Sequence, residues 1–335
     1  MIFKRNNAGA ASPGRSIWLQ AGMVAAGIVL LIMLGVAWYW SRTPDVFWVN
    51  EKADANGTVI GYSTTDTLVR VARTLLDKPG GYLTNDVTPP SVFLDNIPNW
   101  ELGVLQQVRD LARVIRNDYS RSQSQSREDP DVAIAEPKFF FDNDSWILPP
   151  TESEYRDAIA GFERYRDRLS GTDTEAQFFA RADNLREWLA QVEKRLGSLT
   201  RRLGDSVARD VINTDLAGDP AAAANTTLGD QVPVRTSWFK IDDIFFEARG
   251  TAWALLHFFR AAEFDFADVL KDKNAVVSVR QIIRELEASL APLRSPMVMN
   301  GGGYGLTANH SLVMANYLAR ANAAVINLRE LLDQG

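Results

Sequence analysis

The sequence predicts an all-α protein on a single N-terminal transmembrane helix. Three observations lead to this prediction. An uncharged apolar run fills residues 17–40, apolar residues recur at helical spacing through most of the remaining chain, and two helix-capping signals flank a helix break near its middle. We expect a periplasmic helical bundle with a long αα-hairpin and extended arms.

The apolar run at residues 17–40 is long enough to cross a bilayer. Its 24 residues span about 36 Å as a helix, whereas the hydrocarbon layer is roughly 30 Å thick. Trp18 at one end and Trp38-Tyr39-Trp40 at the other are typical of headgroup-level aromatic belts. A cleaved signal peptide is the competing interpretation, but no small-residue cleavage site follows the run.

The charges before the run predict its orientation. Lys4, Arg5 and Arg15 precede it without any acidic residue, so residues 1–16 should form a cytoplasmic tail. Everything after the transmembrane helix should then lie in the periplasm, on a bacterial inner membrane.

Composition excludes several function classes. The chain has no cysteine, so disulfides, thiolate catalysis and cysteine-ligated zinc are ruled out. Three of the 36 basic residues lie in the tail. The rest of the chain therefore has 33 basic and 42 acidic residues and a net charge of about −9, which disfavours a nucleic-acid partner. Just two histidines, His257 and His310, leave little for a metal site. We expect no metal and no cofactor.

Changes in composition divide the exported part. An arm and helices near the membrane occupy 41–130, with a turn signal at Asn56-Gly57 and helices starting near Asp66 and Pro98. Three further regions follow. An extended segment (131–150) and a helical hairpin together fill 131–216, a mobile loop fills 217–236, and C-terminal helices fill 237–335.

The hairpin prediction depends on two capping boxes and a heptad repeat. Thr151 to Glu154 and Thr172 to Glu175 each match the capping-box pattern, separated by a helix break at Ser170-Gly171. The second helix carries two apolar rows with seven-residue spacing: Phe178, Leu185, Val192 and Leu199, and Ala182, Leu189, Leu196 and Leu203. Such a seam is typical of a coiled coil or a long bundle helix, so Phe178 to Leu203 is also a candidate homo-oligomer surface.

Three titratable residues are weak candidates for catalysis. Asp243 and Glu247 are four residues apart on one helix face and are able to share a proton, although neighbouring Lys240 and Arg249 favour a structural ion-pair network. His310 falls in the first turn of the last predicted helix. His257 lies in the most apolar helix, where a neutral core histidine is the usual outcome.

Two glycine turns resemble each other and supply the candidate binding residues. Gly80-Gly81-Tyr82 is followed by Asn85, and Gly302-Gly303-Tyr304 is followed by Asn309. Both turns are explained by glycine C-caps of helices. Alternatively they are halves of a pseudo-repeat that meet and form one binding surface, with Tyr82 and Tyr304 as contacts.

Several longer motifs resemble a known family. They are Trp48-Val49-Asn50-Glu51, the stretch from Gly80 to Asp86, Pro98-Asn99-Trp100-Glu101, and the stretch from Phe141 to Pro150. Together they resemble the single-pass membrane proteins of Gram-negative bacteria catalogued as domain of unknown function 2333. The resemblance covers nearly the whole chain after the apolar run. It implies an envelope protein and no particular reaction.

These observations favour a non-enzymatic role. We expect an envelope scaffold or accessory subunit that binds another protein. The alternative is an envelope hydrolase or glycan-binding enzyme that uses Asp243, Glu247 and His310.

Overall fold

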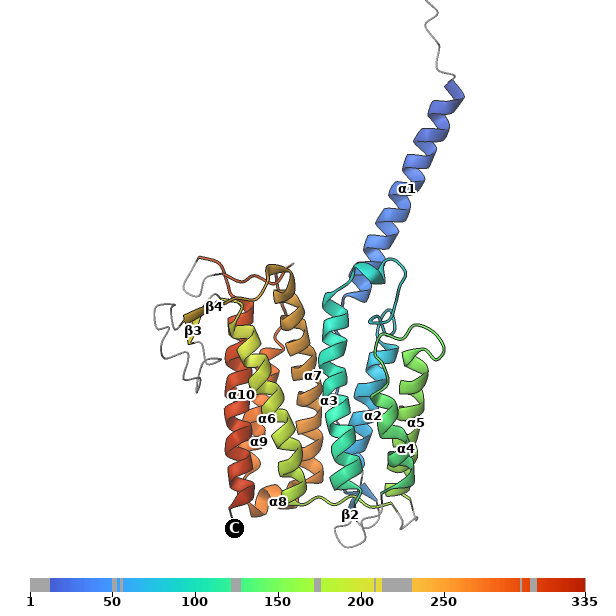
Figure 1. The fold of residues 1–335 in the computed structure, drawn as a ribbon. Coiled ribbons are helices and arrows are strands. Elements are labelled where there is room, and N and C mark those ends of the chain that lie inside the picture. The colour runs from blue at the N-terminus through green and yellow to red at the C-terminus, as the bar shows by residue number, and fades with distance from the viewer. Residues whose placement is uncertain are drawn as a thin grey trace, which may run out of the picture.

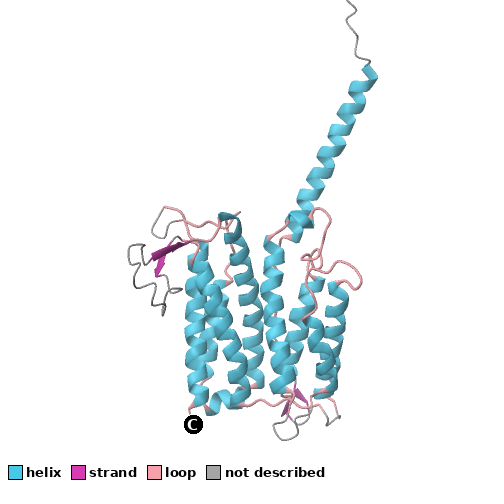
Figure 2. Ribbon diagram, in the orientation of Figure 1, coloured by secondary structure: helices cyan, strands magenta, loops and turns pink. Residues whose placement is uncertain are grey.

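The computed structural model confirms the all-α fold class. It describes residues 13–49, 53–54, 57–121, 128–171, 176–207, 209–212, 231–295, 297–301 and 306–334. The elements are α1 (Pro13–Trp40), β1 (Ala53–Asp54), β2 (Gly57–Thr58), α2 (Tyr62–Asp77), η1 (Ser91–Phe93), α3 (Asn96–Val114), η2 (Ile115–Tyr119), α4 (Pro130–Phe139), α5 (Thr151–Leu169), α6 (Ala182–Gly204), β3 (Arg209–Ile212), β4 (Gln231–Val234), η4 (Trp238–Lys240), α7 (Ile241–Asp265), α8 (Ala267–Asp272), α9 (Val276–Ser289) and α10 (His310–Asp333). In the part of the chain that is described, strands form just two short antiparallel ribbons (Figure 2).

Helix α1 projects from the body formed by the other helices (Figure 1). Its stretch Trp18–Trp40 is long and apolar enough to cross a membrane, with a mean hydropathy of 2.3. Those properties fit either a membrane anchor or a signal sequence. We call the end of the body where α1 joins it the α1 end; the connections α2–α3, α4–α5 and α9–α10 all lie there.

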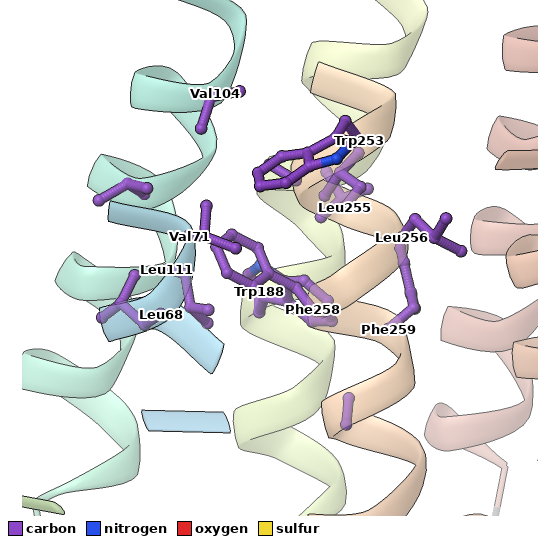
Figure 3. Packing of buried hydrophobic residues seen from close by; sticks show 14 of the residues in the cluster. Leu68, Val71, Val104, Leu111, Trp188, Trp253, Leu255, Leu256, Phe258 and Phe259 are labelled. Atoms are coloured by element: carbon purple, nitrogen blue, oxygen red, sulfur yellow. The ribbon is translucent and has the colours of Figure 1, made fainter. Parts of the chain in front are cut away.

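The body consists of two groups of helices that meet along α7. Helices α2, α3, α4 and α5 form one group, and α6, α7, α9 and α10 form the other; α3 and α2 both pack against α7. Figure 3 shows the central core, where Trp188 from α6 and the run from Trp253 to Phe259 in α7 approach side chains of α2 and α3. Burial of these large side chains supplies most of the favourable free energy of folding.

Two glycines allow the two groups to approach closely. A Cβ atom on Gly103 in α3 would lie 2.1 Å from the carbonyl oxygen of Glu247, and one on Gly250 in α7 would lie 2.0 Å from that of Trp100. The backbones of α3 and α7 therefore touch at both positions, and no other residue fits there without moving a helix.

The predicted αα-hairpin is wrong in its pairing, although both of its helices form. Helix α5 packs against α4 and α2, whereas α6 packs against α10 in the other group (Figure 1). The reason is the connection: α6 begins at Ala182, and residues 176–181 before it form no helix, with the Phe179 N–H bound to the carbonyl oxygen of Tyr119. The chain thus crosses from one group to the other. The second capping box, Thr172 to Glu175, lies outside the described residues.

The heptad seam is buried within the chain. Its residues from Leu185 to Leu203 lie on the face of α6 that is covered by the body, and α10 is the main neighbour of that helix. Phe178 precedes the helix and instead packs against Tyr119 and Phe266. A homo-oligomer through this seam stays an untested prediction, and its apolar side chains are already used inside one chain.

Three further segments differ from expectation. Residues 130–139 form α4 rather than an extended segment, because Asp129 caps the helix and Pro130 suits its first turn. Within the predicted mobile loop, Gln231–Val234 pairs with Arg209–Ile212, and 217–230 lies outside the described residues. Helix α2 starts at Tyr62 rather than near Asp66, with Asp265 Oδ2 accepting from the Thr64 N–H at 2.6 Å.

Candidate functional site

The first glycine turn encloses a buried ion pair. Gly80 and Gly81 have φ values of 87° and 73°, in the left-handed region that glycine adopts readily. The turn folds back over Lys78, whose Nζ lies 2.5 Å from Oε1 of Glu101 with both side chains 0% exposed. Glu101 also accepts hydrogen bonds from the backbone N–H groups of Leu83 and Thr84. The turn is therefore organised around a charge pair in the core.

Tyr82 and Asn85 face inward from this turn. Tyr82 is 3% exposed and donates its hydroxyl hydrogen to the carbonyl oxygen of Asn143 at 3.1 Å. Asn85 donates to the carbonyl oxygen of Ser145 at 2.9 Å and to Oε2 of Glu152 at 2.8 Å. In this arrangement Tyr82 offers no surface to a ligand, and its motif joins the α2–α3 connection to the α4–α5 connection.

The second glycine turn precedes α10, and its described residues include Gly301 and Asn309. Gly302, Gly303 and Tyr304 lie outside the described residues, so a meeting of the two turns stays a prediction. Asn309 caps α10: its Oδ1 accepts from the Leu312 N–H, and its amide donates to the carbonyl oxygen of Gly301. Helices α10 and α2 belong to different groups of the body.

The three candidate catalytic residues lie in different environments. Glu247 forms a bidentate pair with Arg202 of α6, at 2.8 and 2.6 Å, beside a polar cavity of about 290 Å³. Asp243 accepts from the side-chain amide of Asn99 in α3 at 2.8 Å, and burial raises its pKa. His310 accepts from the Met299 N–H through Nδ1 and lines a separate cavity against α7. The structure does not bring the three into one cavity.

A strap of residues 41–48 fixes α1 to the body. The Phe47 N–H donates to Nε2 of His257 at 3.0 Å, and the two rings stack with centroids 3.8 Å apart. Nδ1 of His257 lies 2.6 Å from the carbonyl oxygen of Trp253, so the neutral tautomer with hydrogen on Nδ1 makes both bonds. The strap carbonyl of Asp45 accepts from Trp253 Nε1, and the guanidinium of Arg70 lies over the Phe47 ring.

The strap also borders a cavity between itself and the helices of the body. This strap cavity, about 690 Å³, is bounded by Tyr39 and residues 41–46 on one side and by Trp100, Phe246, Arg249 and Leu293 on the other. A second cavity of about 320 Å³, the α10 cavity, lies between α7, the segment after α9 and α10. Arg249 and Leu293 line both cavities.

Arg249 is a partly buried cation at the α1 end that is bound by backbone carbonyl groups. It donates to the carbonyl oxygens of Ala291 and Leu290, at 3.1 and 3.2 Å, beyond the end of α9. Among the described residues no carboxylate pairs with it, and burial lowers the pKa of its guanidinium. Positive charge at a helix C-terminus is favourable, so Arg249 stabilises α9. The side chain of Arg249 lies at the wall of both the strap cavity and the α10 cavity.

The strap is one of the extended arms that the sequence predicts after α1. Sequence reasoning missed the bond between this arm and His257 and the role of Arg249, because the aromatic sequence around Phe47 does not show which helix the arm contacts. Sequence spacing places Arg249 near Asp243 and Glu247, but it does not show that Glu247 pairs with Arg202 instead. In the described part of the chain, no cluster of three His, Asp or Glu side chains is placed to hold a metal ion.

Comparison with known proteins yields one result. No curated protein matches the chain, and no solved structure matches it. The family described as "Uncharacterized protein conserved in bacteria (DUF2333)" matches residues 13–335. The match extends from the first turn of α1 to the end of the chain, and the protein therefore belongs to the DUF2333 family of bacterial proteins.

Proposed function

We propose that this protein is an inner-membrane scaffold or accessory subunit whose helical body lies in the periplasm and binds another envelope protein. The apolar length of α1 supports the anchor, and the cations at Lys4, Arg5 and Arg15 support the orientation. Membership in a bacterial family agrees with such a location.

The observation that carries the proposal is the strap. Two hydrogen bonds hold the chain directly after α1 against the central helix α7: the Phe47 N–H donates to the His257 side chain, and the Trp253 side chain donates to the carbonyl oxygen of Asp45. The stacked rings of Phe47 and His257 add to this contact. A body fixed in this way keeps one orientation to its anchor, whereas a Gly/Ser-rich tether would let it swing. A fixed orientation suits a subunit that holds a partner at a set place near the membrane.

We assign the partner to the α10 cavity. Its walls combine apolar side chains with Arg249, His310 and Tyr317, and Val313 on the first turns of α10 is exposed beside it. A small set of polar groups within an apolar lining is the usual composition of a binding site. An apolar side chain next to a carboxylate would match this cavity, because the carboxylate would complete the bonding of Arg249.

The hydrolase alternative has weaker support. It requires Asp243, Glu247 and His310 to act on one substrate, and Glu247 and His310 line different cavities. Both carboxylate oxygens of Glu247 already accept hydrogen bonds from Arg202.

Site-specific photo-crosslinking in cells tests the proposal. A photoreactive residue in place of Val313 should give one discrete adduct of higher mass in membranes, whereas the same residue in place of Ile134, exposed on α4, should give none. Arg249→Gln should weaken the adduct at position 313. Equal adducts at both positions, or none at either, would contradict the assignment of this surface.

Topology needs its own test. A reporter that is active only in the periplasm, fused after Gly335, should be active, and a cytoplasm-specific reporter should be silent. The reverse pattern would overturn the orientation without touching the helical fold.

A further inference from the structure

Exposed apolar side chains gather in two connections at the α1 end. In the α2–α3 connection, Val87, Val92 and Phe93 are exposed, and Phe93 is 74% exposed. In the α4–α5 connection, residues 146–148 (Trp-Ile-Leu) are exposed, and Leu148 is 88% exposed. Large apolar side chains displayed together usually mark a contact surface rather than a surface in water.

These two connections form one structural unit. Tyr82 at the base of the first donates to the carbonyl oxygen of Asn143 in the second, and Asn85 donates to that of Ser145. Both donors are buried, so the bonds are protected from water. The apolar residues of the two connections are thus displayed by a fixed base.

Leu148 is held in an unfavourable backbone conformation. Its φ of 58° lies in the left-handed region. Leucine has a higher free energy in this region than in an extended conformation. Thr151 and Ser145 brace this stretch: Thr151 N–H donates to the carbonyl oxygen of Ser145, and Ser145 Oγ donates to that of Pro149. A strained residue that is also nearly fully exposed indicates that its display has a use.

The same unit borders the last turn of α1. Gly80 begins the α2–α3 connection, and a Cβ atom there would lie 2.8 Å from Cγ of the Trp40 ring. The side chains of Val36, Ala37 and Trp40 are partly covered, whereas residues 18–32 of α1 are exposed. In Figure 1 the α2–α3 connection rises to the level of the lower turns of α1.

We propose that these two connections form a second membrane contact, in which Phe93, Trp146, Ile147 and Leu148 enter the interfacial layer of the bilayer beside α1. This inference rests on the proposed anchoring by α1. If α1 spans a membrane, its final turns lie at headgroup level, and the apolar residues of the neighbouring unit reach the same level. The contact is continuous with the anchor, which is why lipid is the occupant that we favour over a protein.

The charges around the unit define the type of contact. Exposed Asp95, Asp142 and Asp144 lie in the same connections. Acidic residues oppose binding to anionic headgroups. The insertion of apolar side chains, and not electrostatic attraction, must therefore drive the contact with the membrane. The contact should form on a neutral bilayer and should be insensitive to salt.

Single-cysteine labelling tests this inference cleanly, because the chain has no natural cysteine. The full chain carrying Phe93→Cys or Leu148→Cys, labelled with an environment-sensitive fluorophore, is reconstituted into phosphatidylcholine vesicles. Val277→Cys, at the exposed start of α9 far from α1, is the matched control. A shallow nitroxide-labelled lipid should quench the labels at 93 and 148 to roughly half, and should leave the label at 277 unchanged.

A label at Leu31→Cys, near the middle of the apolar span of α1, separates the two levels of the proposal when it is read with a lipid that carries its nitroxide near the bilayer centre. Quenching at 31 without quenching at 93 and 148 would keep the anchor and overturn the second contact. Absence of quenching at 31 would instead show that α1 does not span the bilayer, and the proposed function would fail first. Labels at 93 and 148 that are unquenched in vesicles but shielded in native membranes would assign the surface to a protein and overturn the lipid contact.

Discussion

The backbone N–H of Phe47 donates to Nε2 of His257, a residue 210 positions later in the chain. This bond requires the imidazole to be neutral at Nε2. Burial lowers the pKa of His257 to about 4, and the nearby guanidinium groups of Arg260 and Arg70 act in the same direction. The strap that joins α1 to the body is therefore sensitive to acid.

The first prediction is a loss of stability as pH falls. The unfolded chain binds a proton at His257 near pH 6.5, but the folded chain resists protonation until about pH 4. Stability from this group is thus present above pH 6.5 and should fall by about 3 kcal/mol between pH 6.5 and 4. Melting curves of the full chain in detergent at pH 7, 5.5 and 4 measure the effect.

His257→Gln is the control for this prediction, because glutamine keeps one donor and one acceptor without titrating. Burial also raises the pKa of Asp265 to about 6, which makes its contribution to stability fall as pH rises from about 4 to 6. The contribution of Asp265 is the same in both proteins, so it cancels when the stability of His257→Gln is subtracted from that of wild type at each pH. A variant with the same pH dependence as wild type would refute the role of His257.

The second prediction concerns the contact between α3 and α7. Gly250→Ala places a methyl group where the carbonyl oxygen of Trp100 lies, so the helices must separate, and we expect a loss of about 3 kcal/mol. Gly197→Ala in α6 is the matched control, since its nearest neighbour would be 3.7 Å away and alanine favours a helix by about 1 kcal/mol. Thermal unfolding should rank the control at or above wild type. A Gly250→Ala protein as stable as wild type would show that the helices are not in backbone contact.

The fold class was predictable because helical spacing is a local property. Leu189 and its heptad partners mark a buried face regardless of which helix covers it. The covering helix, α10, lies more than a hundred residues further along, and no local pattern identifies it. Helix α4 was missed for a different reason: Pro130 and Pro137 both lie within it, and proline ordinarily signals a break.

The candidate site was less predictable than the fold. The motif from Gly80 to Asn85 looked like a binding turn because glycine and tyrosine are common in such turns. Its role depends on Glu101, which lies at 0% exposure beneath it and pairs with Lys78. Burial of an ion pair is a tertiary property, so a sequence cannot distinguish this turn from one that faces solvent.

The third prediction tests that ion pair. Glu101→Gln keeps the acceptor for the Leu83 N–H but leaves Lys78 as an uncompensated buried charge, and we expect a loss of about 3–5 kcal/mol. Combining it with Lys78→Met should restore part of this loss, because the stranded charge is removed. Arg73→Met, which breaks the partly exposed pair with Glu163, should cost at most about 1 kcal/mol. If Glu101→Gln unfolds no earlier than Arg73→Met, the pair is not buried.

The last prediction concerns the seam of α6, and it separates a fold-forming seam from an oligomer interface. Leu189 is fully buried, on the face of α6 that packs within the body. Leu189→Asp places a charge among apolar neighbours and should cost about 4 kcal/mol or more, as uncompensated buried charges do. Gln191→Asp, on the exposed face of the same helix, adds the same charge and should change stability by about 0.5 kcal/mol or less. Light scattering on both variants completes the test: a Leu189→Asp protein that stays folded but becomes smaller than wild type would place the seam between two chains instead of within one.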